Sequence, residues 1–505
     1  MTVHRRKILF LDDVFLRHRR NLHRKVNPAV KHPEPVMRVD APWNTERDDF
    51  NYVNVIHDDV EGVFKMWYAV VTRKERGCAA RTWAYATSED GIHWRRPILG
   101  RVDINGSTEN NYCLPPLYEF CWTMVHDPSD PPARRYKMIF TVDDGGGGQI
   151  HGGHYHVPLN LAYSADGLAW DRPVHVNPVL RGVSDAGFTL YYDRDRRKYV
   201  LFTRRVPNLP RDVSMYESFD LVNWEDRGRV LVAPDAHDPP SMFNLQTMTS
   251  FRYENFHLGL LNTHYTQPDA ESYEVRHRPP EGTDSRLGLV DVQLAWSRDG
   301  QQWHRPEDRS AIVPNGEPGT PDAGIIFVPQ SSPPVVDGTT WIYYTACPER
   351  HSIWDYRAVE DGGRRRRSCM LARMPEDHWV SLDAGDQEGV LVTQPIVMPD
   401  FQACLLNADV DGGAITGELV TPDGKVVDGF GRNDCSPVTG KCKDQPLRWR
   451  GDGEVSDTTV PRRPLCLRLY ITRAKLYALT VTYADQDGGK RRQWENQRWC
   501  DVIAS

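Results

Sequence analysis

Ser88-Glu-Asp90-Gly91-Ile-His-Trp94 is the stretch that decides the fold, because variants of it recur along the chain. The pattern is Ser-x-Asp-Gly-x-x-Trp. Asp-Gly supplies a tight turn with positive φ, and Trp offers a large apolar surface that can pack between neighbouring sheets. Full copies begin again at Ser164 and Ser297. A degenerate copy runs Ser218-Phe-Asp220-Leu-Val-Asn-Trp224, and the weakest runs Met374-Pro-Glu-Asp377-His-Trp379.

The residues before each copy have a recurring layout of their own. An apolar run that often closes on Asp is followed by a short turn and an aromatic-rich strand, as in His57-Asp-Asp59 and then Phe64-Lys-Met-Trp67-Tyr68. Another apolar strand then enters the motif, and the Trp opens a fourth strand. Four strands in each of five units predict a five-bladed β-propeller, to which we assign residues 1–385.

The repeat ends near Leu382-Asp-Ala-Gly385, and the chain beyond it has a different pattern. Stretches of alternating apolar and polar residues surround a turn-rich middle, for example Ile415-Thr-Gly-Glu-Leu-Val420 and Lys475-Leu-Tyr-Ala-Leu-Thr-Val481. Such alternation is typical of an antiparallel sandwich. Residues 386–505 are therefore predicted to form a β-sandwich, and the chain as a whole is all-β.

Composition excludes several classes of protein. The chain has 505 residues, of which 39% are hydrophobic and 10% aromatic, enough for large cores and unlike a disordered protein. The net charge is −7 with both signs intermixed, so a nucleic-acid partner is not expected. The short basic run from Arg364 to Arg367 is interpreted as a solvated loop.

The N-terminus and the cysteines indicate the compartment. The apolar stretch Ile8 to Leu11 is shorter than the roughly 7–15 residues of a secretory signal, and no run reaches the roughly 18 apolar residues of a membrane span. The ten cysteines contain no Cys-x-x-Cys pair, which argues against a zinc ribbon or thioredoxin-like chemistry. A cytoplasmic protein with no membrane partner is therefore expected.

The motifs on a five-bladed ring with a trailing sandwich resemble the furanosidase-type glycoside hydrolases. These are the invertase/inulinase family (family 32) and its arabinanase/xylosidase relatives (family 43). The stretches Phe64-Lys-Met-Trp-Tyr, Tyr136-Lys-Met and Val380-Ser-Leu-Asp-Ala-Gly385 are similar to bacterial proteins termed family 32-like. The resemblance implies a nucleophile or base on the first blade, a Glu as acid and an Asp that orients the sugar. The invertase motifs Trp-x-Asn-Asp-Pro-Asn-Gly, Arg-Asp-Pro and Glu-Cys are absent, so the resemblance concerns architecture more than fructoside specificity.

Four acidic residues stand just before the expected inner strands, where side chains converge on the axis of a propeller. Glycoside cleavage requires two carboxyl groups, about 5–5.5 Å apart for retention and about 6.5–9.5 Å apart for inversion. We assign Asp49 as nucleophile or general base and Asp185 as the orienting carboxylate, and either Glu119 or Asp322 as general acid. Each of them alone also fits a turn-capping acid.

Other residues are candidates for binding substrate. Trp43 lies outside the repeat position and can stack on a sugar face, with Asn44 beside it. Arg204 and Arg205 end a strand and can bind a carboxylate or hydroxyl groups, or form a surface ion pair.

Three histidines complete the candidate set. His264 and His351 each follow an aromatic-rich strand and can face the same pocket. His154 lies in a glycine-rich loop with His151 and His156, where binding at the pocket rim is favoured over a structural zinc site.

The sequence therefore predicts a glycoside hydrolase that cleaves a furanoside or small oligosaccharide by a two-carboxylate mechanism. No cofactor is required, although a structural calcium ion on the ring axis would be compatible. The alternatives are a non-catalytic carbohydrate-binding propeller, and a phosphorylase or transglycosylase on the same ring.

Overall fold

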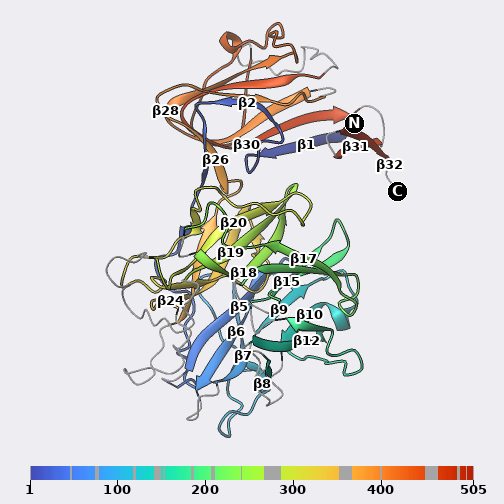
Figure 1. The fold of residues 1–505 in the computed structure, drawn as a ribbon, viewed down its shortest axis with the longest axis vertical. Helices are drawn as coiled ribbons and strands as arrows, with labels where there is room; N and C mark the ends of the chain where they lie inside the picture. Colours follow the sequence, from blue (N-terminus) through green and yellow to red (C-terminus); the bar gives the residue numbers. More distant parts are fainter. Residues whose placement is uncertain are drawn as a thin grey trace. The chain divides into compact units, whose positions relative to one another are not determined.

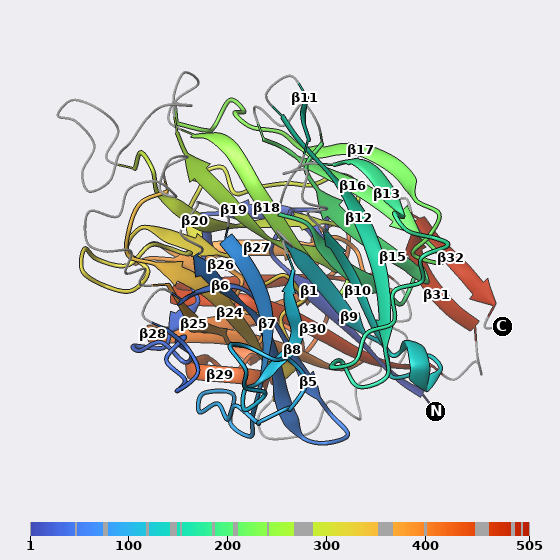
Figure 2. The ribbon, with the colours of Figure 1, turned by 90° about the horizontal axis from the view of Figure 1, so that it is seen from below.

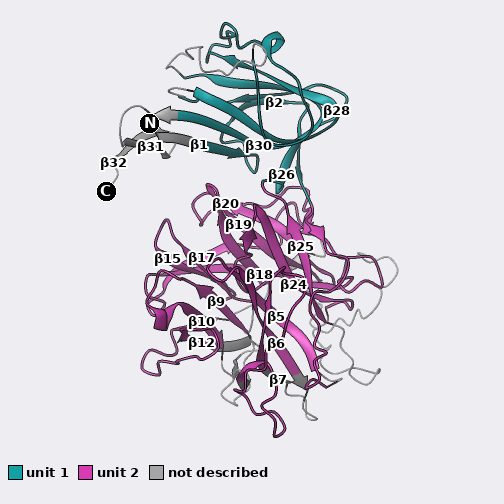
Figure 3. Ribbon diagram, turned by 180° about the vertical axis from the view of Figure 1, so that it is seen from behind, with its two compact units in different colours: residues 1–27, 377–505 teal, residues 28–376 magenta. Residues whose placement is uncertain are grey.

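The computed structural model forms two compact units, Pro28–Glu376 and Met1–Asn27 together with Asp377–Ser505 (Figures 1 and 3). The residues that the structure describes are 2–45, 48–73, 79–117, 121–141, 149–151, 154–183, 187–205, 211–239, 242–266, 286–351, 367–397, 401–449, 464–485, 490–495 and 498–503.

The larger unit is the predicted five-bladed propeller, each blade an antiparallel sheet that runs outward from an innermost strand (Figure 2). Blade 1 contains β5 (Asp48–Asp58), β6 (Val63–Arg73), β7 (Ala79–Ser88) and β8 (Tyr112–Leu117). Blade 2 contains β9 (Trp122–His126), β10 (Tyr136–Thr141), β12 (His154–Ser164) and β13 (Leu180–Val183), with β11 (Gln149–His151) paired to β12. Blade 3 contains β14 (Thr189–Asp193), β15 (Lys198–Thr203), β16 (Val213–Ser218) and β17 (Glu225–Leu231).

Blades 4 and 5 are joined by one parallel contact, Val290 with Ile325. Blade 4 contains β18 (Met242–Tyr253), β19 (Phe256–Tyr265), β20 (Val290–Ser297) and β21 (Ala311–Val313). Blade 5 contains β22 (Ile325–Phe327), β24 (Thr339–Cys347), β25 (Ser368–Met374) and β4 (Val30–Lys31), with β23 (Val335–Val336) paired to β24. The strand β4 comes from the beginning of the unit and pairs with β25 from its end. The two ends of the unit therefore meet in blade 5 and close the ring.

In blades 1 to 4 the repeated motif is a side-chain-capped turn at the end of the third strand. In the first copy, Ser88 Oγ accepts the amide proton of Gly91 at 2.9 Å, and Asp90 Oδ1 accepts those of Ile92 and His93 at 2.9 and 2.8 Å. Gly91 has φ +72°, a conformation that glycine adopts without steric cost. The same contacts recur at the Ser164, Ser218 and Ser297 copies.

In blades 1, 2 and 4, a tryptophan or glycine of the motif contacts the previous blade. Trp94 packs edge-on against Tyr343 of blade 5, with ring centroids 5.7 Å apart, and Trp303 packs edge-on against Phe202 of blade 3 at 5.5 Å. Trp67 of blade 1 donates to the carbonyl of Gly167 in blade 2 at 2.7 Å. The prediction that the motif is scaffold, with Trp between neighbouring sheets, is confirmed.

The innermost strands are tied together by threonine hydroxyls. Thr189 of β14 donates to Met248 O in β18, and Thr249 of β18 donates to Pro329 O just after β22. Gln330 N donates to Val53 O in β5 at 2.8 Å, which links blades 5 and 1. These bonds hold the inner strands in fixed register, so side chains at their starts have fixed positions.

The second unit is the predicted sandwich, built on two 20-residue strands, β28 (Phe401–Val420) and β30 (Cys466–Asp485), which pair along their length. A break in register between Val410 and Ala414 lets both strands bend and contribute to two layers around one core. The remaining strands of its main sheet are β1 (Thr2–Leu9), β2 (Leu16–Arg20), β3 (His23–Val26), β26 (Val380–Ala384), β27 (Gly389–Thr393) and β29 (Val438–Pro446). A separate hairpin follows, β31 (Lys490–Glu495) with β32 (Arg498–Ile503).

The border between the units differs from the expected one at residue 385. β1 pairs with β30, β2 with β27 and β3 with β26, so residues 1–27 belong to the sandwich rather than to the propeller. The chain returns to the sandwich at Asp377. The N-terminal strands could not be assigned from sequence because their partners lie hundreds of residues away.

The described cysteines are free thiols, and all of them except the half-buried Cys442 are buried. Cys435 and Cys442, which are seven residues apart in the sequence, are therefore not bridged to one another. In the described part of the chain, no helix has the length and apolar character needed to cross a membrane.

Candidate functional site

Two inner strands are bulged at the end of the ring where the inner strands begin. In β5 the register shifts between Asn51 and Val53, and the intervening Tyr52 has φ +35°. In β18 it shifts between Leu245 and Thr247, which leaves Gln246 outside the ladder. Bulges re-aim side chains and are common beside functional sites, so these two residues mark this end of the ring for closer attention.

Gln246 connects three basic side chains from blades 3 and 4. Its Oε1 lies 2.9 Å from Arg211 Nη1 and 3.5 Å from Arg204 Nη1, and its Nε2 lies 2.9 Å from His264 Nδ1. Because both guanidinium groups donate to the oxygen, the amide nitrogen is the donor to His264. His264 Nδ1 therefore accepts, and the ring proton is on Nε2. Gln246 is only 5% exposed, so this arrangement is sheltered from bulk water.

His264 is a neutral imidazole. Burial lowers its pKa well below the ordinary value, and the neighbouring His351, Arg211 and Arg204 lower it further. The rings of His264 and His351 lie 4.5 Å apart, and His351 meets the Phe327 ring edge-on at 6.2 Å. His264 and His351, predicted to face the same pocket, therefore lie side by side, and their role in binding substrate stays a prediction.

Aromatic rings continue the cluster toward blade 1. Phe327, on the innermost strand of blade 5, lies 6.4 Å from the ring of the bulged Tyr52 on β5. Tyr52 also packs against the apolar core that contains Cys121 of blade 2. Imidazole, amide, guanidinium and aromatic groups from blades 3, 4, 5 and 1 therefore form one continuous arc, which we call the axial cluster: Tyr52, Arg204, Arg211, Gln246, His264, Phe327 and His351.

Asp49 lies at the start of β5, three residues before Tyr52, and is 3% exposed. Its Oδ1 accepts the amide protons of Phe50 at 3.1 Å and Arg367 at 3.2 Å, and its Oδ2 is 3.8 Å from Arg367 Nε. The carboxylate is therefore held at the inner-strand position that the sequence predicted. Arg367 does not behave as the solvated residue expected of the run from Arg364, since its side chain is only 9% exposed and lies against Asp49.

Asp322 has a different environment from Asp49. Its Oδ2 binds Lys31 Nζ of the outermost strand β4 at 2.6 Å and the hydroxyl of Tyr344 at 2.9 Å, while Thr320 donates to Oδ1 at 3.1 Å. These contacts fasten the loop before β22 to the outer part of blade 5. A role as general acid stays a prediction for which these contacts give no support.

Trp43, Asn44 and Arg205 contact outer strands. Trp43 Nε1 donates to Asn111 Oδ1 at 3.1 Å, and Asn44 Nδ2 donates to the Tyr112 hydroxyl at 2.7 Å, both at the start of β8. Arg205 pairs with Asp226 of β17, the surface ion pair that the sequence left open. Among the described contacts, none joins these three side chains to the axial cluster, and their binding roles stay predictions.

Two predicted acids, Glu119 and Asp185, lie outside the described residues. The backbone of His154 pairs with His151 in the hairpin of β11 and β12, but the described part of the structure does not include its side chain. Among the described residues, no group of three or more His, Cys, Asp or Glu side chains is arranged to hold a metal ion.

Asp291 and Asp212, at the starts of the third strands of blades 4 and 3, have raised pKa values because they are buried. Burial raises the pKa of Asp291 to about 6, although Thr263 and Tyr265 donate hydrogen bonds to it. The two donors engage separate oxygens, the Tyr265 hydroxyl at 3.0 Å from Oδ2 and Thr263 at Oδ1. Both oxygens of Asp291 are therefore engaged within blade 4.

Sequence reasoning missed Gln246, Arg211, Tyr52, Phe327 and Arg367. The stretch Ser241 to Gln246 carries no carboxylate, and a bulge has no signature in a single sequence.

No family model matches the sequence. A Mycobacterium tuberculosis protein described as uncharacterized is 26% identical over 178 residues, which are 34% of this chain and 50% of that protein. The chain thus spans about half the length of the curated relative that it matches.

Solved structures of carbohydrate-active propeller enzymes are similar to this chain at low identity. A β-1,2-mannobiose phosphorylase from Listeria innocua, in complex with β-1,2-mannobiose, is 11% identical, with 68% of this chain and 96% of that chain covered and a TM-score of 0.45. A fructofuranosidase from Schwanniomyces occidentalis is 11% identical, covering 89% and 98%, with a TM-score of 0.40. A sucrose-6-phosphate hydrolase from Lactobacillus gasseri is 11% identical, covering 88% and 92%, with a TM-score of 0.39.

Proposed function

We propose that the protein is an enzyme that cleaves a glycosidic bond, with a furanoside or small oligosaccharide as substrate and Asp49 as nucleophile or general base. The observation that carries this proposal is the position of Asp49. It is a buried carboxylate at the start of an innermost strand, at the same end of the ring as the axial cluster.

The axial cluster supplies the groups that sugar recognition requires. The neutral His264 offers an Nε2–H donor, the two arginines offer planar forks of donors, and the faces of Tyr52 and Phe327 suit stacking on a sugar ring. The backbone amides of Phe50 and Arg367 hold the Asp49 carboxylate through its Oδ1. In this proposal Glu119 or Asp322 is the general acid and Asp185 orients the sugar.

Turnover of aryl-furanosides and aryl-pyranosides tests the proposal, with NMR of the first released anomer to distinguish retention from inversion. Asp49→Asn is expected to lower kcat by about 10³-fold or more while substrate still binds, because the amide cannot act as nucleophile or base. Asp48→Asn is the matched control. The Asp48 side chain accepts the amide proton of Thr45 at 2.8 Å, so this change should leave kcat nearly unaltered.

Binding of oligosaccharides without turnover of any substrate would instead indicate a carbohydrate-binding propeller. Equal loss of turnover in both variants would remove Asp49 from its proposed role.

Phosphorolysis is a second candidate reaction, favoured by one specific observation. Two like-charged guanidinium groups, those of Arg204 and Arg211, converge on the single amide oxygen of Gln246 beside two imidazoles. Such a group of donors suits an oxyanion. If inorganic phosphate is the co-substrate, turnover should require phosphate and release a sugar 1-phosphate, and Arg211→Gln should raise the KM for phosphate. Turnover that is independent of phosphate would exclude this reaction.

A further inference from the structure

The sandwich has a groove on the outer face of one of its layers. The strands β2, β27, β30 and β28 are neighbours there in this order. Leu391 of β27 and Leu469 of β30 belong to the core, so Val392 and Arg468, which alternate with them along the strands, lie on the opposite face. The groove on this face has a volume of about 640 Å³, within the roughly 300–1,000 Å³ of ligand sites. It is therefore large enough for a small-molecule ligand.

The floor of the groove is apolar, and a turn forms one wall. Val390 and Val392 line the floor beside Tyr470, and Val390 is only 8% exposed. The turn of residues 421–424 follows β28. Its Pro422 carbonyl accepts a hydrogen bond from Arg17 Nη1 of β2 at 2.7 Å, so the turn and β2 are connected across the sheet.

The charged side chains that line the groove are three arginines and one aspartate. Arg468 pairs with Glu418 at 2.6 Å, and Asp423 lies 3.6 Å from Lys425, so each of these two lining residues has an opposite charge beside it. The charge of the groove is therefore that of the two remaining arginines, both on β2. The groove is positive, although the chain as a whole has a net charge of −7.

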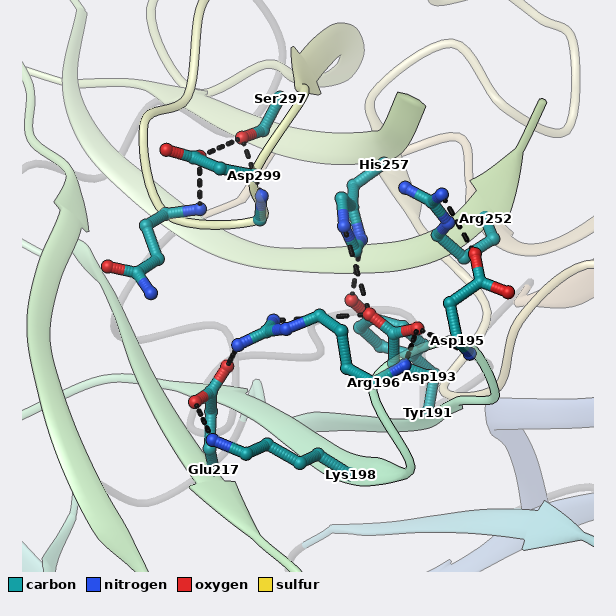
Figure 4. Close-up of polar contacts among 12 residues, drawn as sticks. Tyr191, Asp193, Asp195, Arg196, Lys198, Glu217, Arg252, His257, Ser297 and Asp299 are labelled. Carbon is teal, nitrogen blue, oxygen red and sulfur yellow. Dashed lines mark hydrogen bonds and ion pairs between the residues drawn. The ribbon is translucent and has the colours of Figure 1, made fainter. Parts of the chain in front are cut away.

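These two arginines, Arg17 and Arg20, have no acidic partner among the described residues. Arg252 of the propeller is different, since it pairs with Asp195 at 3.0 Å (Figure 4). A guanidinium group without an acid beside it can bind the carboxylate of a ligand through two parallel hydrogen bonds. Arg17 and Arg20 are therefore the groups in this groove that suit an anionic ligand.

The two arginines line the groove at separate points. β2 is bulged at Arg17, where the register shifts between Leu16 and His18, and Arg17 lines the groove as Arg20 does. Three positions along a strand separate the Cα atoms of Arg17 and Arg20 by roughly 10 Å. Positive charges at two such points suit an extended ligand with several negative groups better than a compact ion such as phosphate.

We propose that this groove binds an acidic oligosaccharide, a short chain of uronic acid residues. Its carboxylates pair with Arg17 and Arg20, and the apolar faces of its sugar rings lie on Val390 and Val392. The negative charge of the ligand follows from the groove itself, whereas the choice of a saccharide rests on the function proposed above. The groove lies in the sandwich and the axial cluster in the propeller, so the groove has a role in binding alone.

Isothermal titration calorimetry of the full chain with trigalacturonate tests this site. The wild type should bind it with an affinity that falls as the salt concentration rises, because salt screens exposed charges. Arg20→Gln should raise the Kd about tenfold, the loss expected for one charged contact. Inorganic phosphate and a single-stranded oligonucleotide are titrated in parallel as the alternative anions.

Arg19→Gln is the matched control, since it makes the same change of charge on the same strand. Arg19 Nη1 donates to Leu22 O at 3.0 Å and its Nε lies 3.5 Å from Asp13, and Arg19 does not line the groove. Its Kd for trigalacturonate should stay within about twofold of the wild-type value. Equal losses in the two variants, tighter binding of phosphate or of the oligonucleotide through Arg20, or no binding of trigalacturonate by the wild type would each overturn the proposal.

Two further measurements separate this groove from the proposed cleavage reaction. Asp49→Asn should keep the wild-type Kd for trigalacturonate at the groove, and Arg20→Gln should keep the wild-type turnover of neutral aryl-glycosides. Turnover without Arg20-dependent binding would refute the groove alone. Arg20-dependent binding without turnover of any substrate would refute the cleavage reaction and support the groove.

Discussion

The two ends of the propeller are built on different principles. At the end that carries the motif turns, the same contacts repeat from blade to blade: Ser and Asp cap a turn in blades 1 to 4, and in blades 1, 2 and 4 a glycine or tryptophan of that turn meets the previous blade. At the opposite end, Gln246, His264 and His351 come from different strands and from two blades, and they contact one another. The comparison teaches that repetition maintains the scaffold, while bulges that interrupt the repeat create the candidate site.

Gly167→Ala should produce the largest effect, at the repetitive end. A Cβ at Gly167 would lie 2.6 Å from Trp67 Cζ2, and the residue has φ +73°. The clash and the left-handed backbone together should cost about 3 kcal/mol of unfolding free energy. Thermal or denaturant unfolding measures this cost, with Gly62→Ala as the control for the backbone alone. If the two variants were equally stable, the turn would not be a contact between blades.

At the opposite end of the ring, Gln246→Leu should lower the catalytic activity. The substitution leaves His264 Nδ1 without its donor and removes the acceptor shared by Arg204 and Arg211. On a substrate identified by the aryl-glycoside screen, we expect kcat/KM to fall by about 10²-fold, with a changed pH profile as the tautomer of His264 is released.

Gln293→Leu serves as its control within blade 4. Gln293 binds Arg305 at 2.9 Å, away from the axial cluster, so this variant should lose stability but keep kcat/KM. A normal pH profile in Gln246→Leu would show that the amide has only a structural role.

His257 should make the repetitive end sensitive to acid. Burial lowers its pKa to about 3, and the charges of Arg252 and Arg196 contribute. The unfolded chain binds a proton near pH 6.5 while the folded chain does not, so stability is lost as pH falls from 6.5 toward 3. Between pH 7 and pH 5 the wild type should lose about 2 kcal/mol more than His257→Asn. Parallel stability curves for the two proteins, from denaturant titrations at constant ionic strength, would contradict this assignment.

Arg205→Gln should have the smallest effect and separates two adjacent arginines. Arg205 forms a surface pair with Asp226, whereas Arg204 is buried against Gln246. We expect Arg205→Gln to change the unfolding free energy by less than about 0.5 kcal/mol and to leave kcat/KM unchanged. Arg204→Gln, measured in the same assay, should lower kcat/KM. Similar losses in both variants would extend the candidate site to Arg205.

The sequence predicted the scaffold because its signals are local. Even the degenerate copy forms the motif turn: Leu221 takes the glycine position with φ +66° and packs into the core between blades 2 and 3. The positions of Asp49, Arg204, His264 and His351 near strand ends were predictable because the repeat shows where each strand begins and ends, while their functional roles stay predictions. Gln246 and Tyr52 could not, since a bulge depends on how two strands pair.

Long-range partners were equally invisible in the sequence. In the sequence, Asp322 has the position of an acid just before an innermost strand. Its ion-pair partner, Lys31 of β4, is distant in the chain and becomes evident only in the structure. In the sequence, Arg367 is part of a basic run that suggests a solvated loop. In the structure its backbone amide donates to Asp49 at the start of β5.

The pairing of β1 with β30 has a consequence for how the protein is made. β1 is synthesised before the propeller and β30 after it, so the whole propeller is an insertion within the sandwich. A ribosome therefore completes the ring while three sandwich strands, β1 to β3, still await their partners. A fragment that starts at residue 386 would lack those strands, together with β26, and would expose the edges of β27 and β30 with which they pair. Such open edges invite association between chains, so the order of synthesis makes the sandwich the last part of the protein to be protected.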